Sequence, residues 1–203
     1  MVGFEYPTSP HARRHGPAGY EDYESFRAWL RDEFIFRCVY CLHREQWYSR
    51  GATFHIDHFN PSTTHPSQKC EYSNLLYACG TCNEAKQAII GLPDPCQVAF
   101  HNCLRVMADG RIDPLNPDGE KLEQVLRLNS ASNLRNRFKW MRMLAALSAS
   151  DQKIYQEIYQ ELMGFPEDLP DLRAKRAPRN TRPEGAANCY FALRERGELP
   201  ATY

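Results

Sequence analysis

Apolar residues recur along most of the chain at helical spacing and only briefly at the spacing of a strand. Between Glu21 and Phe34 they fall three or four positions apart, which predicts an amphipathic helix whose role is packing. The run from Thr53 to Ile56 is short, partly β-branched and aromatic, and is stopped by Asn60-Pro61. That pattern is typical of a strand that ends in a turn, and the polar residues 62–73 that follow predict a loop.

The second half of the chain is predicted to be mostly helical. Good helix formers run from Asn83 to Ile90 and stop at Gly91, which indicates a short helix, and three more segments carry apolar residues at helical spacing. Their apolar positions are Leu122, Val125 and Leu126, then Leu134, Phe138, Met141 and Ala145, then Ile154, Tyr155, Ile158, Tyr159 and Leu162. Residues 164–185 are rich in proline and basic side chains, and a last short helix is expected around Ala187 to Arg196. The expected fold class is α+β.

Composition places the chain among ordinary soluble globular proteins. Its 203 residues are 42% hydrophobic, with 25 basic and 25 acidic side chains. The length suits one sizeable domain or a small domain with helical additions. We expect no membrane span and no secretory signal, and therefore a cytoplasmic protein in a reducing compartment. Zero net charge argues against tight unaided binding of nucleic acid, so any such surface must be local or supplied by a partner.

Two cysteine pairs predict a structural zinc site. Cys38 and Cys41 form one C-x-x-C pair, and Cys79 and Cys82 form another. Together they supply the four thiolates of a tetrahedral zinc, although a redox pair or buried free thiols are the alternatives. The long gap of residues 42–78 must hold a folded segment. Four further cysteines show no metal-binding spacing and are expected to pack in the core: Cys70, Cys96, Cys103 and Cys189.

The segment between and after the cysteine pairs carries a specific order of polar residues. FHIDHFNP (residues 54–61) is followed by SNLL (73–76) and CGTCNEAK (79–86). This order resembles the HNH family of ββα-metal (His-Me finger) nucleases across residues 38–86. The resemblance implies a small zinc-stabilised ββα-metal core inside a mostly helical chain, and implies that Asn74 braces the loop that orients His58. Residues 94–129 more weakly resemble the HNH subunit of Septu-type or retron-associated anti-phage defence systems.

The residue types also suit phosphodiester hydrolysis, which needs a base for water and a cation for the phosphate. His58 is the expected base, because an imidazole titrates near neutral pH. The Asp57 carboxylate and the Asn83 carbonyl are oxygen ligands of the kind that Mg²⁺ prefers. Asn83 stands where some members of the family have a final histidine, which favours Mg²⁺ over softer ions. The catalytic set is therefore His58, Asp57, Asn74 and Asn83.

Two nearby side chains are candidates for contact with nucleic acid. Lys86 lies three residues after Asn83, so on a helix it shares that face and is positioned to meet a phosphate. The alternative is a solvated surface lysine. His55 shares a strand face with Asp57, which makes it a candidate to line the site, although a satisfied structural histidine is the favoured interpretation of this residue.

Three alternatives to the nuclease fit parts of this pattern. Asp57-His58 is also compatible with a structural pair in an ordinary fold. A zinc nucleobase deaminase uses H-x-E and P-C-x-x-C, but here Asp57 replaces the glutamate, Ala78 replaces the proline, and the first cysteine pair has no purpose. A non-enzymatic zinc module that binds a partner or nucleic acid agrees with the neutral charge, but it has no need of the catalytic set.

The predicted organisation has four parts: an extended N-terminal arm (1–20), an HNH nuclease core with its four-cysteine zinc site (21–115), a helical extension (116–163), and a basic Pro-rich strap with a terminal helix (164–203). The parts outside the core are expected to recruit something. The resemblance implies a defence complex with an ATPase subunit, and DNA as the favoured substrate. The basic residues of the strap are Arg173, Lys175, Arg176, Arg179 and Arg182.

Overall fold

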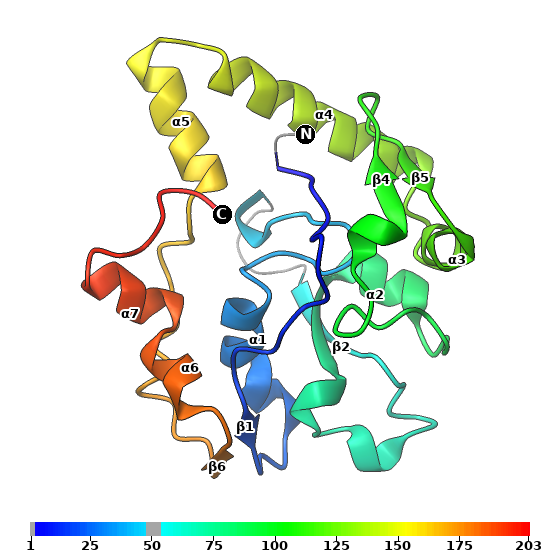
Figure 1. Cartoon of the computed structure of the whole chain (residues 1–203), viewed down its shortest axis with the longest axis vertical. Helices are drawn as coiled ribbons and strands as arrows, with labels where there is room; N and C mark the ends of the chain where they lie inside the picture. Colours follow the sequence, from blue (N-terminus) through cyan, green and yellow to red (C-terminus); the bar gives the residue numbers. More distant parts are fainter. Residues whose placement is uncertain (1–2, 48–53) are drawn as a thin grey trace.

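An antiparallel hairpin that runs directly into a helix lies at the centre of the protein (Figure 1). In this computed structural model, which describes residues 3–47 and 54–203, strand β2 (Phe54–His58) pairs with β3 (Leu75–Cys79), and α2 (Gly80–Lys86) follows at once. The register sets His58 opposite Leu75 and Phe54 opposite Cys79. The expected strand therefore extends through Asp57 and His58, while Thr53 lies outside the described residues.

The helix expected between residues 21 and 34 begins as a 3-10 turn. Asp22 accepts a hydrogen bond from the Glu24 amide and caps η1 (Tyr23–Phe26), which leads into α1 (Arg27–Glu33). Helix α1 packs against β3, with Trp29 and Leu30 buried. An isolated bridge between Arg37 and Arg44 then closes the turn that holds the first cysteine pair, before η2 (Glu45–Trp47).

Short elements occur in the expected 62–73 loop between the hairpin strands, and further short elements follow α2. The 62–73 loop contains η3 (Pro66–Gln68) and leads to η4 (Tyr72–Asn74). Helix α2 starts before Asn83 and ends at Lys86, short of the predicted stop at Gly91. Further on, η5 (Phe100–Asn102) precedes a hairpin of β4 (Leu104–Val106) and β5 (Ile112–Pro114), which the hydrophobic pattern did not predict.

The C-terminal half contains the expected helices. They are α3 (Pro117–Val125), α4 (Ala131–Ser148) and α5 (Lys153–Met163), and the side chains of Asn116 and Ser130 cap the first two. The terminal helix expected around Ala187 to Arg196 is present as α7 (Tyr190–Glu195). A separate short helix, α6 (Pro183–Ala187), precedes it, and the extended backbone of Cys189 separates the two. The expected α+β class is confirmed.

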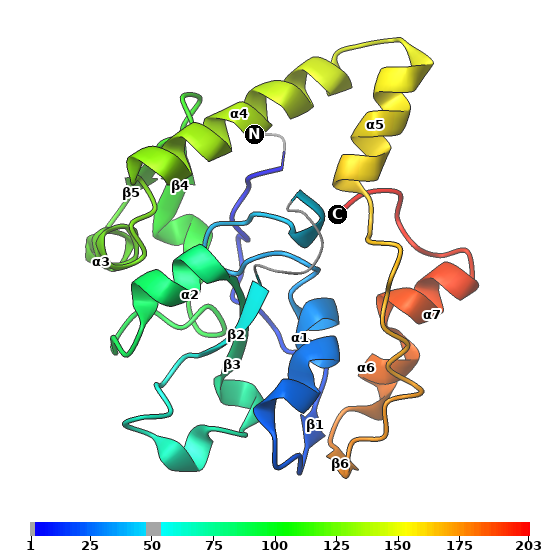
Figure 2. The same ribbon diagram turned by 180° about the vertical axis from the view of Figure 1, so that it is seen from behind.

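The two ends of the chain pack onto the same core. In the arm, β1 (Pro17–Ala18) pairs with β6 (Arg179–Asn180) of the strap, and Figures 1 and 2 show these strands together at one end of the molecule. A single cluster of buried apolar side chains runs from Phe4 and Tyr6 in the arm, through α1 and β3, to Ala192 in α7. The four-part organisation remains a prediction, and all four parts contribute to this cluster. No helix in the described residues is long and apolar enough to cross a membrane.

A buried carboxylate ties the arm to α1. Glu33 accepts hydrogen bonds from the His11 ring, the backbone amides of Arg14 and His15, and the Tyr72 hydroxyl. Burial alone would raise the pKa of this carboxyl, but the hydrogen bonds from His11 and Arg14 lower it to about 2. Glu33 is therefore ionised at neutral pH and holds the arm by charge-assisted bonds.

Candidate metal centre and catalytic pocket

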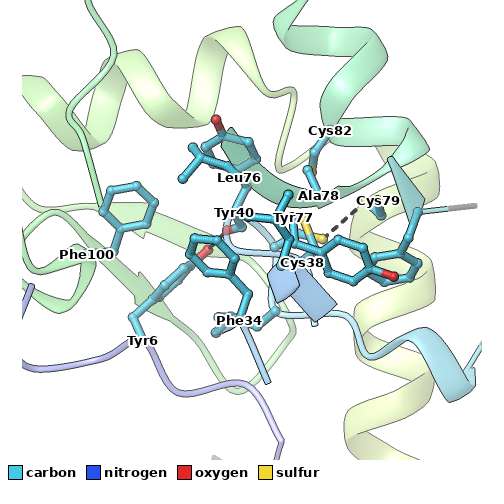
Figure 3. Packing of buried hydrophobic residues seen from close by; sticks show 14 of the residues in the cluster. Tyr6, Phe34, Cys38, Tyr40, Leu76, Tyr77, Ala78, Cys79, Cys82 and Phe100 are labelled. Carbon is cyan, nitrogen blue, oxygen red and sulfur yellow. Dashed lines mark hydrogen bonds between the residues drawn. The ribbon is translucent and has the colours of Figure 1, made fainter. Parts of the chain in front are cut away.

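The two cysteine pairs meet in one buried cluster. Cys38, Cys41, Cys79 and Cys82 are all buried, and their sulfur atoms lie within 4.8 Å of one another. Figure 3 shows Cys38, Cys79 and Cys82 inside the hydrophobic cluster beside Tyr40. The first pair comes from the turn after α1, and the second spans the junction of β3 and α2. The cluster therefore joins the N-terminal segment to the hairpin.

The spacing of these sulfurs fits a tetrahedral metal ion. Zinc–sulfur bonds of about 2.3 Å place the ligands of a tetrahedral site about 3.8 Å apart, and the Cys41 and Cys79 sulfurs are 3.6 Å apart. Hydrogen bonds from Cys38 and Cys41 lower the pKa of Cys79, so a thiolate is favoured within the cluster. These four cysteines can hold a metal ion such as zinc, as the spacing predicted.

The predicted base, His58, is fixed at the end of β2. Its Nε2 lies 3.0 Å from the carbonyl oxygen of Lys69, and its ring meets the ring of Tyr23 edge to face, with centroids 4.9 Å apart. A carbonyl can only accept a hydrogen bond, so in the neutral imidazole Nε2 carries the proton. Nδ1 is then the basic nitrogen of His58.

Asp57 is buried and has two partners. Its Oδ2 accepts a hydrogen bond of 2.6 Å from the Tyr40 hydroxyl, and its Oδ1 lies 3.0 Å from Nζ of Lys86. It makes no hydrogen bond with His58, so the two residues do not form a structural pair. The cysteine turn and α2 thus orient the carboxylate from either side.

The predictions for Lys86 need correction. Its side chain is fully buried, and Nζ donates to Asp57 Oδ1 and, over 2.7 Å, to the carbonyl oxygen of His58. It is neither a solvated surface lysine nor placed to meet a phosphate, because α2 directs this position back toward β2. Lys86 instead connects α2 to the last two residues of β2.

Four of the predicted residues border one pocket beside this connection. The pocket has a volume of about 510 Å³, and His55, Asp57, His58 and Asn83 all line it. His55 is exposed, as expected for a residue that shares a strand face with the pocket wall rather than for a structural histidine. Asn83 is half-buried, and within the described part of the chain its amide has no hydrogen-bond partner. The remaining walls come from η1, the 61–69 loop and the end of α2.

Asn74 lies outside the pocket and braces the loop that leaves β2. Its Oδ1 accepts a hydrogen bond from the Asn60 amide, and its Nδ2 donates to the carbonyl oxygens of Asn60 and Gln68. The Phe59 amide also donates to the Asn74 carbonyl. The loop from 59 to 68 is therefore held against η4, next to Lys69, whose carbonyl positions His58.

Sequence reasoning did not find three residues of this site. Tyr23 was expected only to pack a helix, Tyr40 lies unremarked inside the first C-x-x-C pair, and Lys69 acts through its backbone carbonyl. A tyrosine between two metal-ligating cysteines was the one available signal, because the metal would hold it rigidly near the next strand. A backbone contact leaves no trace in residue identity.

The four remaining cysteines stay outside the cluster. Cys103 and Cys189 are buried, while Cys70 and Cys96 are half-buried, and all are free thiols. His55 also lies outside it, so the described residues do not assemble the mixed histidine and cysteine site of a deaminase.

Neither a family model nor a curated protein matches the sequence.

Proposed function

We propose that this chain is a metal-dependent endonuclease of the HNH, ββα-metal type, which hydrolyses phosphodiester bonds of nucleic acid, with DNA the favoured substrate. The observation that carries the proposal is the pocket where β2 meets α2. It brings a histidine, a carboxylate and an amide that has no hydrogen-bond partner among the described residues together beside a sulfur cluster, which joins the turn after α1 to the junction of β3 and α2. A binding surface has no need of this combination.

His58 acts as the general base. The Lys69 carbonyl holds the proton on Nε2, so Nδ1 is free to take a proton from water. The Tyr23 ring packs against one side of the imidazole and limits its rotation. Asn74 keeps the loop in place through Asn60 and Gln68. It is a positioning residue, because it does not face the pocket.

A divalent cation such as Mg²⁺, when bound, would neutralise charge on the phosphate and on the leaving oxygen. Asp57 and Asn83 are the residues that would hold it, because an aspartate oxygen and an amide oxygen line the same pocket. The Asp57 carboxylate is oriented by Tyr40 and Lys86, and each of its oxygens retains a further lone pair.

We further propose that the nuclease works as the effector of an anti-phage defence complex with a protein partner, in which an ATPase is the expected subunit. Support comes from the weaker resemblance of residues 94–129 and from the neutral overall charge, which favours cleavage only after assembly. Size measurement and pull-down separate an assembled enzyme from one that is fully active as a single chain.

The decisive experiment compares His58→Ala with the purified protein on a panel of DNA and RNA substrates, with and without Mg²⁺. Loss of cleavage by about 10²-fold or more is expected, with zinc content and thermal midpoint unchanged, because general base catalysis contributes about 10²–10⁴-fold. His101→Ala, at an exposed histidine away from the pocket, is the matched control. Equal cleavage by both variants removes His58 from the mechanism.

A second candidate is a non-catalytic zinc module that binds a partner or nucleic acid. One observation favours it: the charge of Asp57 is already compensated by Lys86, so the pocket is stable without a cation. If the wild-type protein binds DNA but cleaves none of the panel with any divalent cation, this second function replaces the first.

A further inference from the structure

Helix α4 presents a face of exposed cations that the proposed active site does not use. Arg135, Lys139 and Arg142 are all exposed, and with a turn of 100° per residue they lie within an arc of about 60°. We call these three residues the α4 basic face. None of the 18 residues of α4 is acidic, although acidic and basic residues balance over the whole chain.

The orientation of this face is fixed by the opposite side of the helix. Arg137, Met141, Leu144 and Leu147 are buried there. The Arg137 guanidinium donates to the carbonyl oxygens of Gly110 and Leu128, and Trp140 stacks on Trp47 with ring centroids 4.7 Å apart. The helix cannot roll to bury the basic face without breaking these contacts.

No carboxylate among residues 3–47 and 54–203 neutralises these three cations. In the described residues none of them forms an ion pair, whereas Arg31, Arg173 and Arg196 are each paired with a carboxylate. Arg142 lies 5.8 Å from the ring centroid of Phe138, an aromatic side chain that is 38% exposed. A row of cations without carboxylate partners is complementary to the phosphates of a nucleic acid.

The place of α4 suits a polymer that also reaches the pocket. Figures 1 and 2 both show α2 between α4 and the β2–β3 hairpin, and α4 along the outer edge of the molecule. Asn83, Gln87 and Ala88 line the pocket, whereas the buried side of α4 faces the core and its basic face lies on the outer surface beyond α2. A nucleic acid that touches both sites therefore has to pass over α2 and continue around α4. The rise of 1.5 Å per residue spreads the three cations over about 10 Å, enough for more than one phosphate.

We infer that the α4 basic face binds the phosphate backbone of the nucleic acid. This inference rests on the proposed function and adds to it the surface that holds the substrate. A chain without net charge can bind a polyanion in this way, because the three positive charges of the α4 basic face are gathered on one local surface. The contact reads no base, because phosphate contacts position a duplex and carry no sequence information.

The test measures binding of a fluorescent 20-base-pair DNA duplex by anisotropy over a salt series, in a His58→Ala background so that no cleavage occurs. Neutralising the face with Arg135→Gln, Lys139→Gln and Arg142→Gln should weaken binding at least about tenfold at low salt. The association constant decreases as the salt concentration rises. The steepness of that decrease, the magnitude of the slope of log association constant against log salt concentration, should be smaller by about 2.7 in the variant, since each lost phosphate contact contributes about 0.9.

A matched triple variant of the strap, Lys175→Gln, Arg176→Gln and Arg179→Gln, removes the same charge at exposed positions and should bind as the parent does. Equal losses in the two triple variants, a loss in the strap variant alone, or no binding by the parent would each overturn the inference. Because binding is read without cleavage, an inactive wild-type enzyme that still binds through α4 refutes only the proposed nuclease.

Discussion

Nζ of Lys86 lies 3.0 Å from Oδ1 of Asp57, with both side chains buried at the junction of β2 and α2. The ion pair places a cation beside the carboxylate that we propose as a metal ligand. Removing one partner of a buried pair leaves an uncompensated charge, which is strongly destabilising, and a second cation relieves that cost. Lys86 and a divalent ion therefore compensate the same charge.

This relationship predicts how Mg²⁺ affects stability. Lys86→Met should lower the free energy of unfolding by about 3–5 kcal/mol without Mg²⁺, and added Mg²⁺ should raise its thermal midpoint more than it raises that of the wild type. Differential scanning fluorimetry over a Mg²⁺ series measures both effects. The double variant Asp57→Asn with Lys86→Met should lose the response, and an equal response in all three proteins would show that the ion does not use Asp57.

The cysteine cluster predicts a loss of metal and fold together. Cys79→Ser should bind less than a full equivalent of zinc and should lose the cooperative thermal transition, because the cluster joins the turn after α1 to the hairpin. Metal analysis and circular dichroism give the two measurements. Cys70→Ser, at a half-buried thiol outside the cluster, should retain both. A fully folded, metal-free Cys79→Ser protein would contradict a structural role.

Asn74 predicts a separation of activity from stability. Asn74→Ala removes the bonds that hold the 59–68 loop, so cleavage should fall by on the order of 10²-fold through misplacement of His58. Asn129→Ala is the matched control, since its amide braces Ile112 in the same way on the β5 strand. Both variants should lose about 1–3 kcal/mol of stability, but only Asn74→Ala should lose activity. Equal activity in the two would leave Asn74 a purely structural residue.

The buried Glu33 predicts a pH-dependent contribution to stability. Its folded-state pKa of about 2 lies below the ordinary value of 4.5, so its stabilisation is present above pH 4.5 and is lost as the pH falls toward 2. The shift corresponds to on the order of 3 kcal/mol at neutral pH. The difference in unfolding free energy between wild type and Glu33→Gln should therefore shrink below about pH 5, as urea titrations at each pH will measure.

The exposed Glu84 on α2 supplies the control, because Glu84→Gln should give a small difference that does not change with pH. A Glu33→Gln difference that stays constant down to pH 3 would show that the bonds from His11 and Arg14 do not favour the charged carboxylate in the folded state.

Local patterns predicted the parts of the fold that depend on neighbours in sequence. Two C-x-x-C pairs indicated the sulfur cluster, and helical spacing indicated α1 and α3 to α5, because both signals are confined to a few turns of chain. The β4–β5 hairpin was missed because its strands are three residues long, too short for an alternating pattern to stand out.

The sulfur cluster joins distant segments and was predictable because two separate C-x-x-C pairs share one chemistry. Other contacts between distant segments carry no such signal and could not be predicted in this way. The pairing of Asp57 with Lys86 joins residues 29 positions apart. A lysine on a short helix is expected to be exposed to solvent unless the position of the neighbouring strand is known. Arg137 is similar, because a basic residue inside an amphipathic helix gave no sign that two backbone carbonyls would bury it. Four residues that line the pocket and the bracing residue Asn74 were identified from the sequence, whereas Tyr23, Tyr40 and the Lys69 carbonyl, which orient Asp57 and His58, were not.

The pairing of β1 with β6 affects when the protein can finish folding. Residues 17 and 18 meet 180 and 179, and Tyr190 donates its amide to Asp32 in α1. During synthesis at about 5–20 residues per second, the roughly 160 residues that separate the two strands take about 8–30 seconds to add, so β1 must wait at least that long for β6 to leave the ribosome. Residues 11–15 can dock on Glu33 in shorter chains, so the segment around Pro17–Ala18 is the part of the arm that should be open to proteolysis in nascent chains, and ribosomes stalled before residue 179 should display it in that state.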